Sequence, residues 1–190
     1  MAKKDEIKWN EKYTQTPKLL EKRDVSINLK KAIKYAKVGL ALDVACGAGK
    51  NSVYLAKNEF NVESYDISQV ALNALDERNY DNITTFCQDL DGFNLQENRY
   101  DFIVMTNFLD REIIPKLAKA LNKNGILFIE TYMHHESNEK KSSNPDFLLS
   151  EGELKTFFDD KYKILDYSEF DNEAEELYKM RKQSITVKKI

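Results

Sequence analysis

Residues 40 to 55, Leu-Ala-Leu-Asp-Val-Ala-Cys-Gly-Ala-Gly-Lys-Asn-Ser-Val-Tyr-Leu, contain the segment that decides the fold. A short apolar run ends in small residues, and a segment with helical spacing follows it. Such a run is typical of a strand that is buried on both faces of a sheet. Glycines let the backbone turn tightly and approach a ligand closely, and the free N–H groups that begin a helix suit an anionic group. The stretch therefore predicts a strand, a ligand-binding turn and a helix.

The alternation of strand and helix continues along the chain. Further strands are expected at the apolar runs 62–65, 83–87, 101–105, 126–129, 162–167 and 184–187. Repeated strand and helix with short connections predicts a parallel sheet covered on both faces, and the last two strands predict an antiparallel hairpin. The predicted fold class is α/β. It is a doubly wound, mostly parallel, seven-stranded Rossmann-like sheet with an antiparallel C-terminal edge hairpin and N-terminal helices.

Local signals predict where helices begin and end. Residues 5–37 carry apolar residues at helical spacing among many Lys and Glu residues, which predicts one or two N-terminal helices. Ser68 is expected to cap the helix after the second strand, and Asn124-Gly125 to end the helix before the fifth. Ser150 is expected to cap a short helix over 151–158.

Charge and composition narrow the class of protein. The net charge of the 190 residues is -3, with both signs interspersed, which argues against a nucleic acid partner. Cys46 and Cys87 form no CxxC pair, no apolar run approaches the ~18 residues of a membrane span, and no secretory leader precedes the first helix. The sequence also has no clustered metal-ligand motif. We expect a cytoplasmic protein without a membrane segment or a metal.

Three acidic residues stand at the ends of the first three predicted strands. They are Asp43, Asp66 and Asp89. Open α/β sheets bind ligands at the carboxyl ends of their strands, and an acid after the second strand accepts hydrogen bonds from ribose hydroxyls in such folds. Each of these aspartates on its own is equally consistent with a helix cap or a turn. Together with the glycine turn, the set favours a ligand site.

These motifs resemble a known family. Asp43-x-Ala45-x-Gly47-x-Gly49 resembles the acid-and-glycine signature of class I S-adenosylmethionine-dependent methyltransferases, with Ala at the first glycine position. The resemblance extends to Asp66, to Asp89-Leu90, to 100–104 and to 124–127. The segments 46–52 and 150–154 are similar to the bacterial tellurite-resistance methyltransferases and their small relatives.

The resemblance implies roles for the residues of the site. Gly47 and Gly49 would pass beside the methionine part of the cofactor S-adenosyl-L-methionine, and Asp43 would orient its amino group. Asp66 would hold the ribose and Asp89 would accept from the adenine amino group. The other expected cofactor contacts are Ala45, Cys46, Asn51, Ile67, Leu90 and Asn107, the last of which would lie between cofactor and substrate.

The methyl acceptor is expected to be a small molecule that the sequence does not identify. The candidates for its contacts are Tyr13, Phe108, Arg111 and Tyr132, and the candidate catalytic groups are Tyr13, Asn107 and His134. For Arg111 a structural role at a helix start is the favoured interpretation, and for His134 a solvated position in a loop. Tellurite-resistance enzymes carry a histidine before the final strand, whereas residues 175–179 here read Glu-Glu-Leu-Tyr-Lys. Tellurite or selenite is therefore not assigned as the substrate.

The expected organisation is a single methyltransferase domain over residues 1–190. Its sections are an N-terminal helical lid (1–38), a cofactor-binding core (39–131), a flexible loop (132–149), and a C-terminal helix with the edge hairpin (150–190). Because the polar loop leaves the fifth strand at the ligand edge, we expect it to form a flap, with a flexible connector as the alternative. The oligomeric state stays open.

Two other functions remain as alternatives. A non-catalytic module that binds S-adenosylmethionine would keep the same binding residues. A nicotinamide-dependent oxidoreductase is suggested by Gly47-x-Gly49-x-x-Ser52, which approaches the dinucleotide fingerprint. Serine replaces the third glycine of that fingerprint, and the only Tyr-x-x-x-Lys pair, Tyr178 and Lys182, lies near the C-terminal edge.

Overall fold

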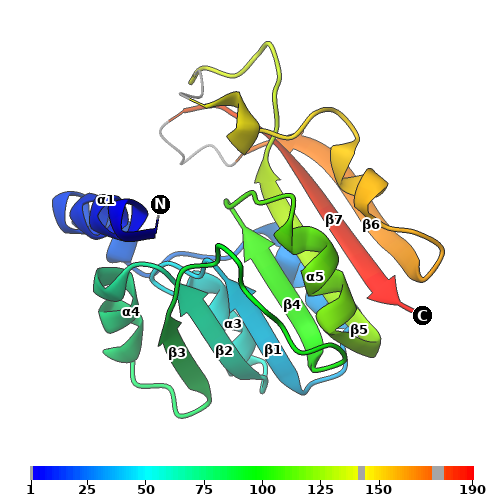
Figure 1. Cartoon of the computed structure of the whole chain (residues 1–190), viewed down its shortest axis with the longest axis horizontal. Helices are drawn as coiled ribbons and strands as arrows, with labels where there is room; N and C mark the ends of the chain where they lie inside the picture. Colours follow the sequence, from blue (N-terminus) through cyan, green and yellow to red (C-terminus); the bar gives the residue numbers. More distant parts are fainter. Residues whose placement is uncertain (1, 141–143, 173–177) are drawn as a thin grey trace.

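Buried apolar runs form the centre of a seven-stranded sheet in the computed structural model, which describes residues 2–140, 144–172 and 178–190. The strand order is β3-β2-β1-β4-β5-β7-β6 (Figure 1). The strands are β1 (Leu40–Val44), β2 (Asn61–Asp66), β3 (Ile83–Cys87), β4 (Tyr100–Thr106), β5 (Leu121–Tyr132), β6 (Tyr162–Asp171) and β7 (Arg181–Lys189). Strands β1 to β5 pair in parallel, whereas β7 runs antiparallel to both β5 and β6. The predicted fold class is confirmed.

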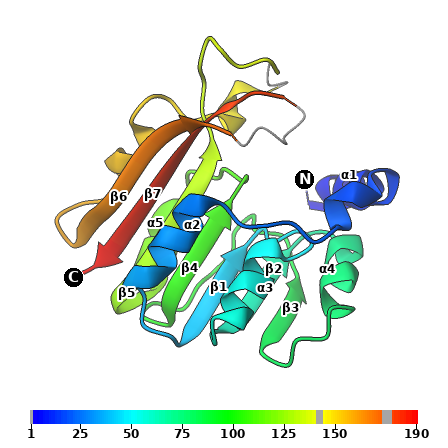
Figure 2. The ribbon, with the colours of Figure 1, turned by 180° about the vertical axis from the view of Figure 1, so that it is seen from behind.

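Helices cover both faces of the sheet. They are α2 (Ile27–Ala32), α3 (Lys50–Lys57), α4 (Gln69–Asp76) and α5 (Ile113–Ala120), whereas α1 (Ala2–Gln15) does not pack on the sheet. Leu29 of α2 and Leu55 of α3 pack with Phe128 on one face, which Figure 2 shows from the front. Ile113 of α5 packs with Leu127 on the other face. The ends of β1, β2, β4 and β5 therefore meet at one edge between two apolar layers, hereafter the carboxyl edge.

Only the later part of the N-terminal segment belongs to the core. Val25, Leu29 and Ala32 are buried against the sheet. By contrast, none of residues 3–20 is fully buried, and α1 lies beside α4 and apart from the sheet (Figures 1 and 2). The predicted helices are present, and a lid role is open only to the part before the core segment.

The predicted helix end at Asn124-Gly125 is wrong. Helix α5 ends at Ala120, and Leu121 already pairs with Tyr100 of β4. Asn124 has a positive φ of 67°, and the pairing shifts between Leu121 and Ile126, so the two residues form an irregularity inside a longer strand. A Cβ at Gly125 would lie 2.9 Å from the backbone oxygens of Asn122 and Tyr100, which explains why glycine stands there.

The predicted cap at Ser150 is also wrong. Residues Glu153–Phe157 form a 3₁₀ helix whose N-cap is Gly152, at a φ of 70°. Ser150 instead donates its N–H to the Glu153 carboxylate at 2.7 Å, and the Gly152 N–H donates to Glu169 at 2.9 Å. A glycine free to adopt the left-handed conformation starts the turn two residues later than the serine signal suggests.

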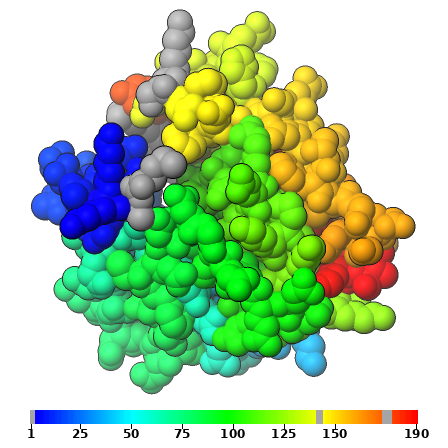
Figure 3. All heavy atoms as spheres, viewed as in Figure 1, coloured from blue at the N-terminus to red at the C-terminus, as the bar shows by residue number. Residues whose placement is uncertain are grey.

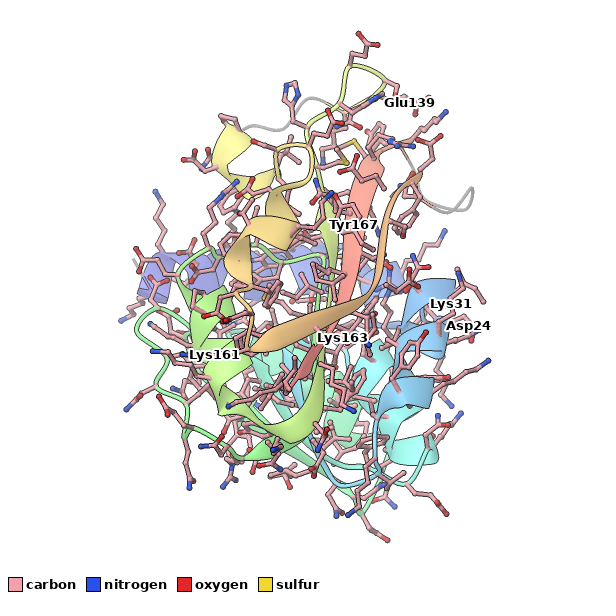
Figure 4. The ribbon with its side chains drawn as sticks, turned by 90° about the vertical axis from the view of Figure 1, so that its right-hand side faces the viewer. Asp24, Lys31, Glu139, Lys161, Lys163 and Tyr167 are labelled. Carbon is pink, nitrogen blue, oxygen red and sulfur yellow. The ribbon has the colours of Figure 1, made fainter. Side chains whose placement is uncertain are left out.

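The two closing strands are longer than predicted, and β6 forms the outer edge of the sheet. Figure 4 shows Lys163 and Tyr167 on this strand and Lys161 just before it. Lysines on an edge strand oppose pairing with another chain. Residues 173–177, which hold most of the acidic stretch and three positions of the segment lacking the expected histidine, lie outside the described residues.

The loop after β5 is tied to the domain near both of its ends. The Leu149 N–H donates to the Tyr132 oxygen at 3.0 Å, and the His134 N–H donates to the Leu149 oxygen at 2.8 Å. The Asn138 side chain donates to Met133 at 2.9 Å and accepts from Arg181 at 2.8 Å. Residues 141–143 lie outside the described part, and flap motion of this loop stays a prediction.

Candidate functional site

The turn between β1 and α3 is built on left-handed backbone conformations. Ala45, Gly47 and Gly49 have φ values of 54°, 54° and 73°. The Cys46 N–H donates to Tyr65 of β2 at 2.9 Å, which fixes the turn to the sheet edge. A Cβ at Gly49 would lie 2.4 Å from Leu75 of α4. The glycines are therefore required by backbone conformation and close packing, and Ala45 is held in a conformation that costs about 1–2 kcal/mol for a residue with a Cβ.

Asp43 is a fully buried acid at the end of β1. Its Oδ2 accepts a hydrogen bond of 2.6 Å from Ser52 of α3, whose own hydroxyl accepts from Ser64 at 2.9 Å. Its Oδ1 has no partner among the described residues. Burial raises the pKa of Asp43 to about 7, although the hydrogen bond from Ser52 favours the ionised form. A buried carboxylate with a free oxygen is suited to accept from a ligand.

Asn51 provides a second acceptor of the same kind. This residue of α3 is buried, and its Nδ2 donates to the Thr106 hydroxyl of β4 at 2.9 Å. Its Oδ1 has no partner among the described residues. Since buried polar atoms almost always have partners, two buried acceptors without donors beside the glycine turn point to a cationic or multiply donating ligand group.

Asp66 connects the glycine turn to the start of α4. Its Oδ2 accepts from the Gly47 N–H at 2.7 Å, and its Oδ1 accepts from the Ser68 N–H at 2.9 Å. Burial raises the pKa of Asp66 in spite of these backbone hydrogen bonds, to which Ile67 adds another. Each carboxylate oxygen keeps acceptor capacity, so two further donors fit. Ser68 caps α4 as predicted, accepting from the Ala71 N–H at 3.2 Å.

The residues that follow β3 and β4 have less specific surroundings. Asp89 is half-buried and accepts from the Asp91 N–H at 2.9 Å, whereas Leu90 belongs to the apolar core. Asn107 is exposed, has a φ of 57°, and donates its N–H to the Glu130 oxygen at 2.9 Å. A non-glycine residue at positive φ on the carboxyl edge is the kind of feature that gathers at functional sites.

Helix α1 brings Tyr13 onto the glycine turn. A Cβ at Gly47 would lie 2.6 Å from the Tyr13 hydroxyl oxygen, so this hydroxyl stands directly over the glycine. Burial raises the pKa of Tyr13, and the negative charge of Asp66 raises it further. Trp9 lies beside Tyr13 with ring centroids 6.0 Å apart. Tyr13 therefore lies on the cofactor side of the predicted site.

Two of the acceptor-side candidates, Arg111 and Phe108, have contacts within the protein. The Arg111 guanidinium pairs with Glu153 at 2.6 Å and donates to the backbone oxygens of Asp146 and Leu148 at 2.6 and 3.0 Å. These contacts favour a role for Arg111 in holding the loop after β5. Phe108 packs against the apolar core, and His134 is exposed.

Sequence reasoning did not select a buried ionic pair at the end of β5. Glu130 and Lys182 lie 3.9 Å apart, and both side chains are 5% exposed. Burial raises the pKa of Glu130, while Lys182 opposes the shift. The Lys182 ammonium also lies 4.7 Å from the centre of the Tyr132 ring. The signal that could have found Glu130 is a charged residue directly after the apolar run 126–129.

Two hollows open on the surface of the domain. One, of about 520 Å³, is lined by residues 151–152, 155 and 167–169, and the other, of about 200 Å³, by residues 63, 65, 93–96 and 99–100. Across residues 2–140, 144–172 and 178–190, no three His, Cys, Asp or Glu side chains gather as metal ligands. Within the same residues, no helix has the length and apolar character to cross a membrane.

Stability should depend on pH through Asp43. Because its pKa is raised to about 7 in the folded chain from an ordinary 3.8, the folded state binds more protons, and lowering the pH through 7 stabilises it. As the pH falls from 7 to 5, this group should raise the free energy of unfolding by up to about 1.4 kcal/mol for each pH unit. When the free energy of unfolding is measured by urea unfolding at several pH values, it should change less steeply with pH in Asp43→Asn than in the wild type. An equal dependence of the unfolding free energy on pH in the two proteins would contradict a raised pKa of Asp43.

Known proteins share both the sequence and the fold. Residues 1–189 match the family described as tellurite resistance protein TehB. A curated relative, the probable S-adenosyl-L-methionine-dependent methyltransferase TehB of Haemophilus influenzae (strain 10810), is 35% identical over 139 residues, which cover 67% of this chain and 47% of the relative. The chain thus spans about half the length of the curated relatives it matches.

Solved structures agree with this match. The crystal structure of TehB from Haemophilus influenzae has a TM-score of 0.73 and 28% identity, covering 87% of this chain and 63% of that one. A S-adenosylmethionine-dependent methyltransferase from Methanosarcina mazei has a TM-score of 0.68 and covers 88% of this chain and 99% of that one. At 16% identity, the second likeness shows the fold alone. Since the family match extends over nearly the whole sequence, this chain belongs to the TehB family of tellurite resistance proteins.

Proposed function

We propose that this chain is an S-adenosylmethionine-dependent methyltransferase that acts on a small-molecule acceptor. The observation that carries the proposal is the glycine turn at the carboxyl edge, which follows the buried acid Asp43 and donates the Gly47 N–H to the buried acid Asp66. The printed name of the curated relatives supports the same activity. The net charge of -3 supports a small acceptor over a nucleic acid, and a cytoplasmic location is part of the proposal.

The residues of the carboxyl edge fit this cofactor. The free oxygens of Asp43 and Asn51 would accept from its amino group, either directly or through water. Asp66 would accept from both ribose hydroxyls while keeping its bonds to Gly47 and Ser68. Ala45, Cys46, Gly49 and Ile67 would line the same slot, and Asp89 with Leu90 would bound the adenine.

The cofactor, when bound, supplies a methyl group that its sulfonium has already activated. The chain then has to hold the acceptor in line and keep water out, and such positioning is worth about 7–11 kcal/mol in favourable intramolecular reactions. Asn107 and Tyr132, at the ends of β4 and β5, would contact the acceptor. Tyr13 closes the cofactor side.

A proton acceptor is needed only if the attacking atom of the acceptor carries a proton. Asn107 cannot serve as a base, which leaves Tyr13 and His134 among the predicted candidates. Arg111 would position the loop after β5 through Asp146 and Leu148, so that the loop closes over the acceptor.

The contacts of Ser52 disfavour the nicotinamide alternative. This residue occupies the third position of the dinucleotide fingerprint, where glycine allows close packing of helix and strand. Here the Ser52 hydroxyl instead bonds Asp43 and Ser64 within the core.

Calorimetry should separate these activities. S-adenosylmethionine and S-adenosylhomocysteine are expected to bind with micromolar-range dissociation constants, and NAD is expected not to bind. Measurable NAD binding without a response to either sulfur compound would refute the proposal. Incubation with the methyl donor and a panel of acceptors then distinguishes an enzyme from a non-catalytic binding module, because only an enzyme forms S-adenosylhomocysteine.

The role of Asp66 can be tested first on the wild-type protein and then on a variant. If Asp66 accepts from both ribose hydroxyls, the wild type should bind the 2′-deoxy analogue of S-adenosylhomocysteine about tenfold to hundredfold more weakly, since a hydrogen bond to a charged group contributes about 1.5–3 kcal/mol. Asp66→Ala should no longer distinguish the two compounds. An equal preference for the 2′-hydroxyl in both proteins would assign the ribose to another residue.

A further inference from the structure

Few contacts hold α1 on the domain. None of residues 3–20 is fully buried, and an isolated helix of this length is marginally stable in water. Figure 3 shows the blue surface of α1 resting on the teal surface of the α4 region. The position of α1 must therefore depend on a small number of specific contacts with α4.

Asn10 makes a polar contact between α1 and the start of α4. Its Oδ1 accepts from the Ser68 hydroxyl at 2.8 Å and from the Val70 N–H at 3.3 Å. The Ser68 hydroxyl also accepts from the Ala71 N–H, so its single proton is directed to Asn10. Ser68 is fully buried. Docking α1 without this acceptor would leave a buried hydroxyl unpaired, which is unfavourable.

The same contact is linked to the cofactor slot by two routes. Through the chain, the Ser68 N–H donates to Asp66, and Asp66 accepts from Gly47. Along α1, Tyr13 follows Asn10 by three residues and therefore shares its face, and the Tyr13 hydroxyl stands over Gly47. The proposed ribose site is thus bordered by five residues that are linked to one another: Asn10, Ser68, Asp66, Gly47 and Tyr13.

We propose that Asn10 is a positioning residue that latches α1 to α4 and so couples the closing of the N-terminal helix to occupation of the Asp66 site. The proposal rests on the proposed function. The Tyr13 hydroxyl stands over Gly47 while α1 is docked, and in this proposal α1 releases to admit the cofactor to the turn. The Asn10–Ser68 bond then forms again and places Tyr13 over the bound cofactor.

The test compares Asn10→Leu with Glu11→Leu, a matched control because Glu11 is exposed on the same helix. In the free protein, trypsin should cleave α1 after Lys8 and Lys12 about fivefold or more faster in Asn10→Leu than in the control. With S-adenosylhomocysteine, Asn10→Leu should show faster association as well as faster dissociation, the latter by about fivefold to thirtyfold. A variant that merely damages the slot would not associate faster. Asn10→Asp keeps the acceptor and should restore both rates.

A double-mutant cycle with Ser68→Ala tests whether the effect of Asn10→Leu comes from the Asn10–Ser68 hydrogen bond. In the Ser68→Ala background, Asn10→Leu should change the dissociation rate much less than in the wild type. The latch is overturned if Asn10→Leu matches Glu11→Leu in cleavage and in both rates, or if its effect is unchanged by Ser68→Ala. If wild-type protein fails to bind S-adenosylhomocysteine, the proposed function is wrong, and the cleavage comparison still tests whether Asn10 holds α1.

Discussion

The carboxylate of Asp66 is the interaction on which the arrangement of the carboxyl edge depends. One of its oxygens holds the Gly47 N–H, and the other holds the Ser68 N–H. The glycine turn after β1 and the start of α4 are therefore fixed relative to each other by one buried side chain. Burial raises the pKa of this carboxyl, and the hydrogen bonds from the backbone of Ser68, Gly47 and Ile67 oppose that shift. A site so constrained is ready to accept from further donors without moving.

A row of buried polar groups extends from this point across the face covered by α2 and α3. It includes Asp43 with Ser52, Asn51 with Thr106, and Glu130 near Lys182. Three oxygens in this row, one each on Asp43, Asn51 and Glu130, have no partner among the described residues. Unpartnered buried acceptors cost stability, since each gives up bonds to water. Natural proteins retain such groups at sites where function requires them, and this row lies at the edge where the cofactor is proposed to bind.

The fold and the cofactor side of the site were predictable because their signals are local. A buried run ending in Asp43, followed by a glycine turn, specifies β1, the turn and the start of α3 within a few residues. Strand β5 was underestimated because Asn124-Gly125 reads as a helix end, and only the pairing with β4 shows it to be an irregularity within a strand. Ser150 was misread as a cap because Gly152 and Glu169, distant in sequence, decide where the turn begins.

The acceptor side was less predictable because its contacts join distant segments. Arg111 follows β4 at the expected edge. Its guanidinium, however, pairs with Glu153 and donates to two carbonyl oxygens of the loop after β5. No sequence motif marks Asn10. Its hydrogen bond joins it to Ser68, nearly sixty residues later in the chain, and only the structure shows that pairing. Pairings of this kind depend on tertiary packing, which periodicity and capping rules do not describe.

The most direct test of the account is a crystal structure of the protein with S-adenosylhomocysteine bound. The account predicts that both ribose hydroxyls lie within hydrogen-bonding distance of the Asp66 carboxylate, with the amino group beside Asp43 and Asn51. It also predicts that Asn10 remains bonded to Ser68 while Tyr13 has moved off Gly47 to cover the ligand. A nucleoside bound away from the glycine turn, with Asp66 still contacting only Gly47 and Ser68, would contradict it.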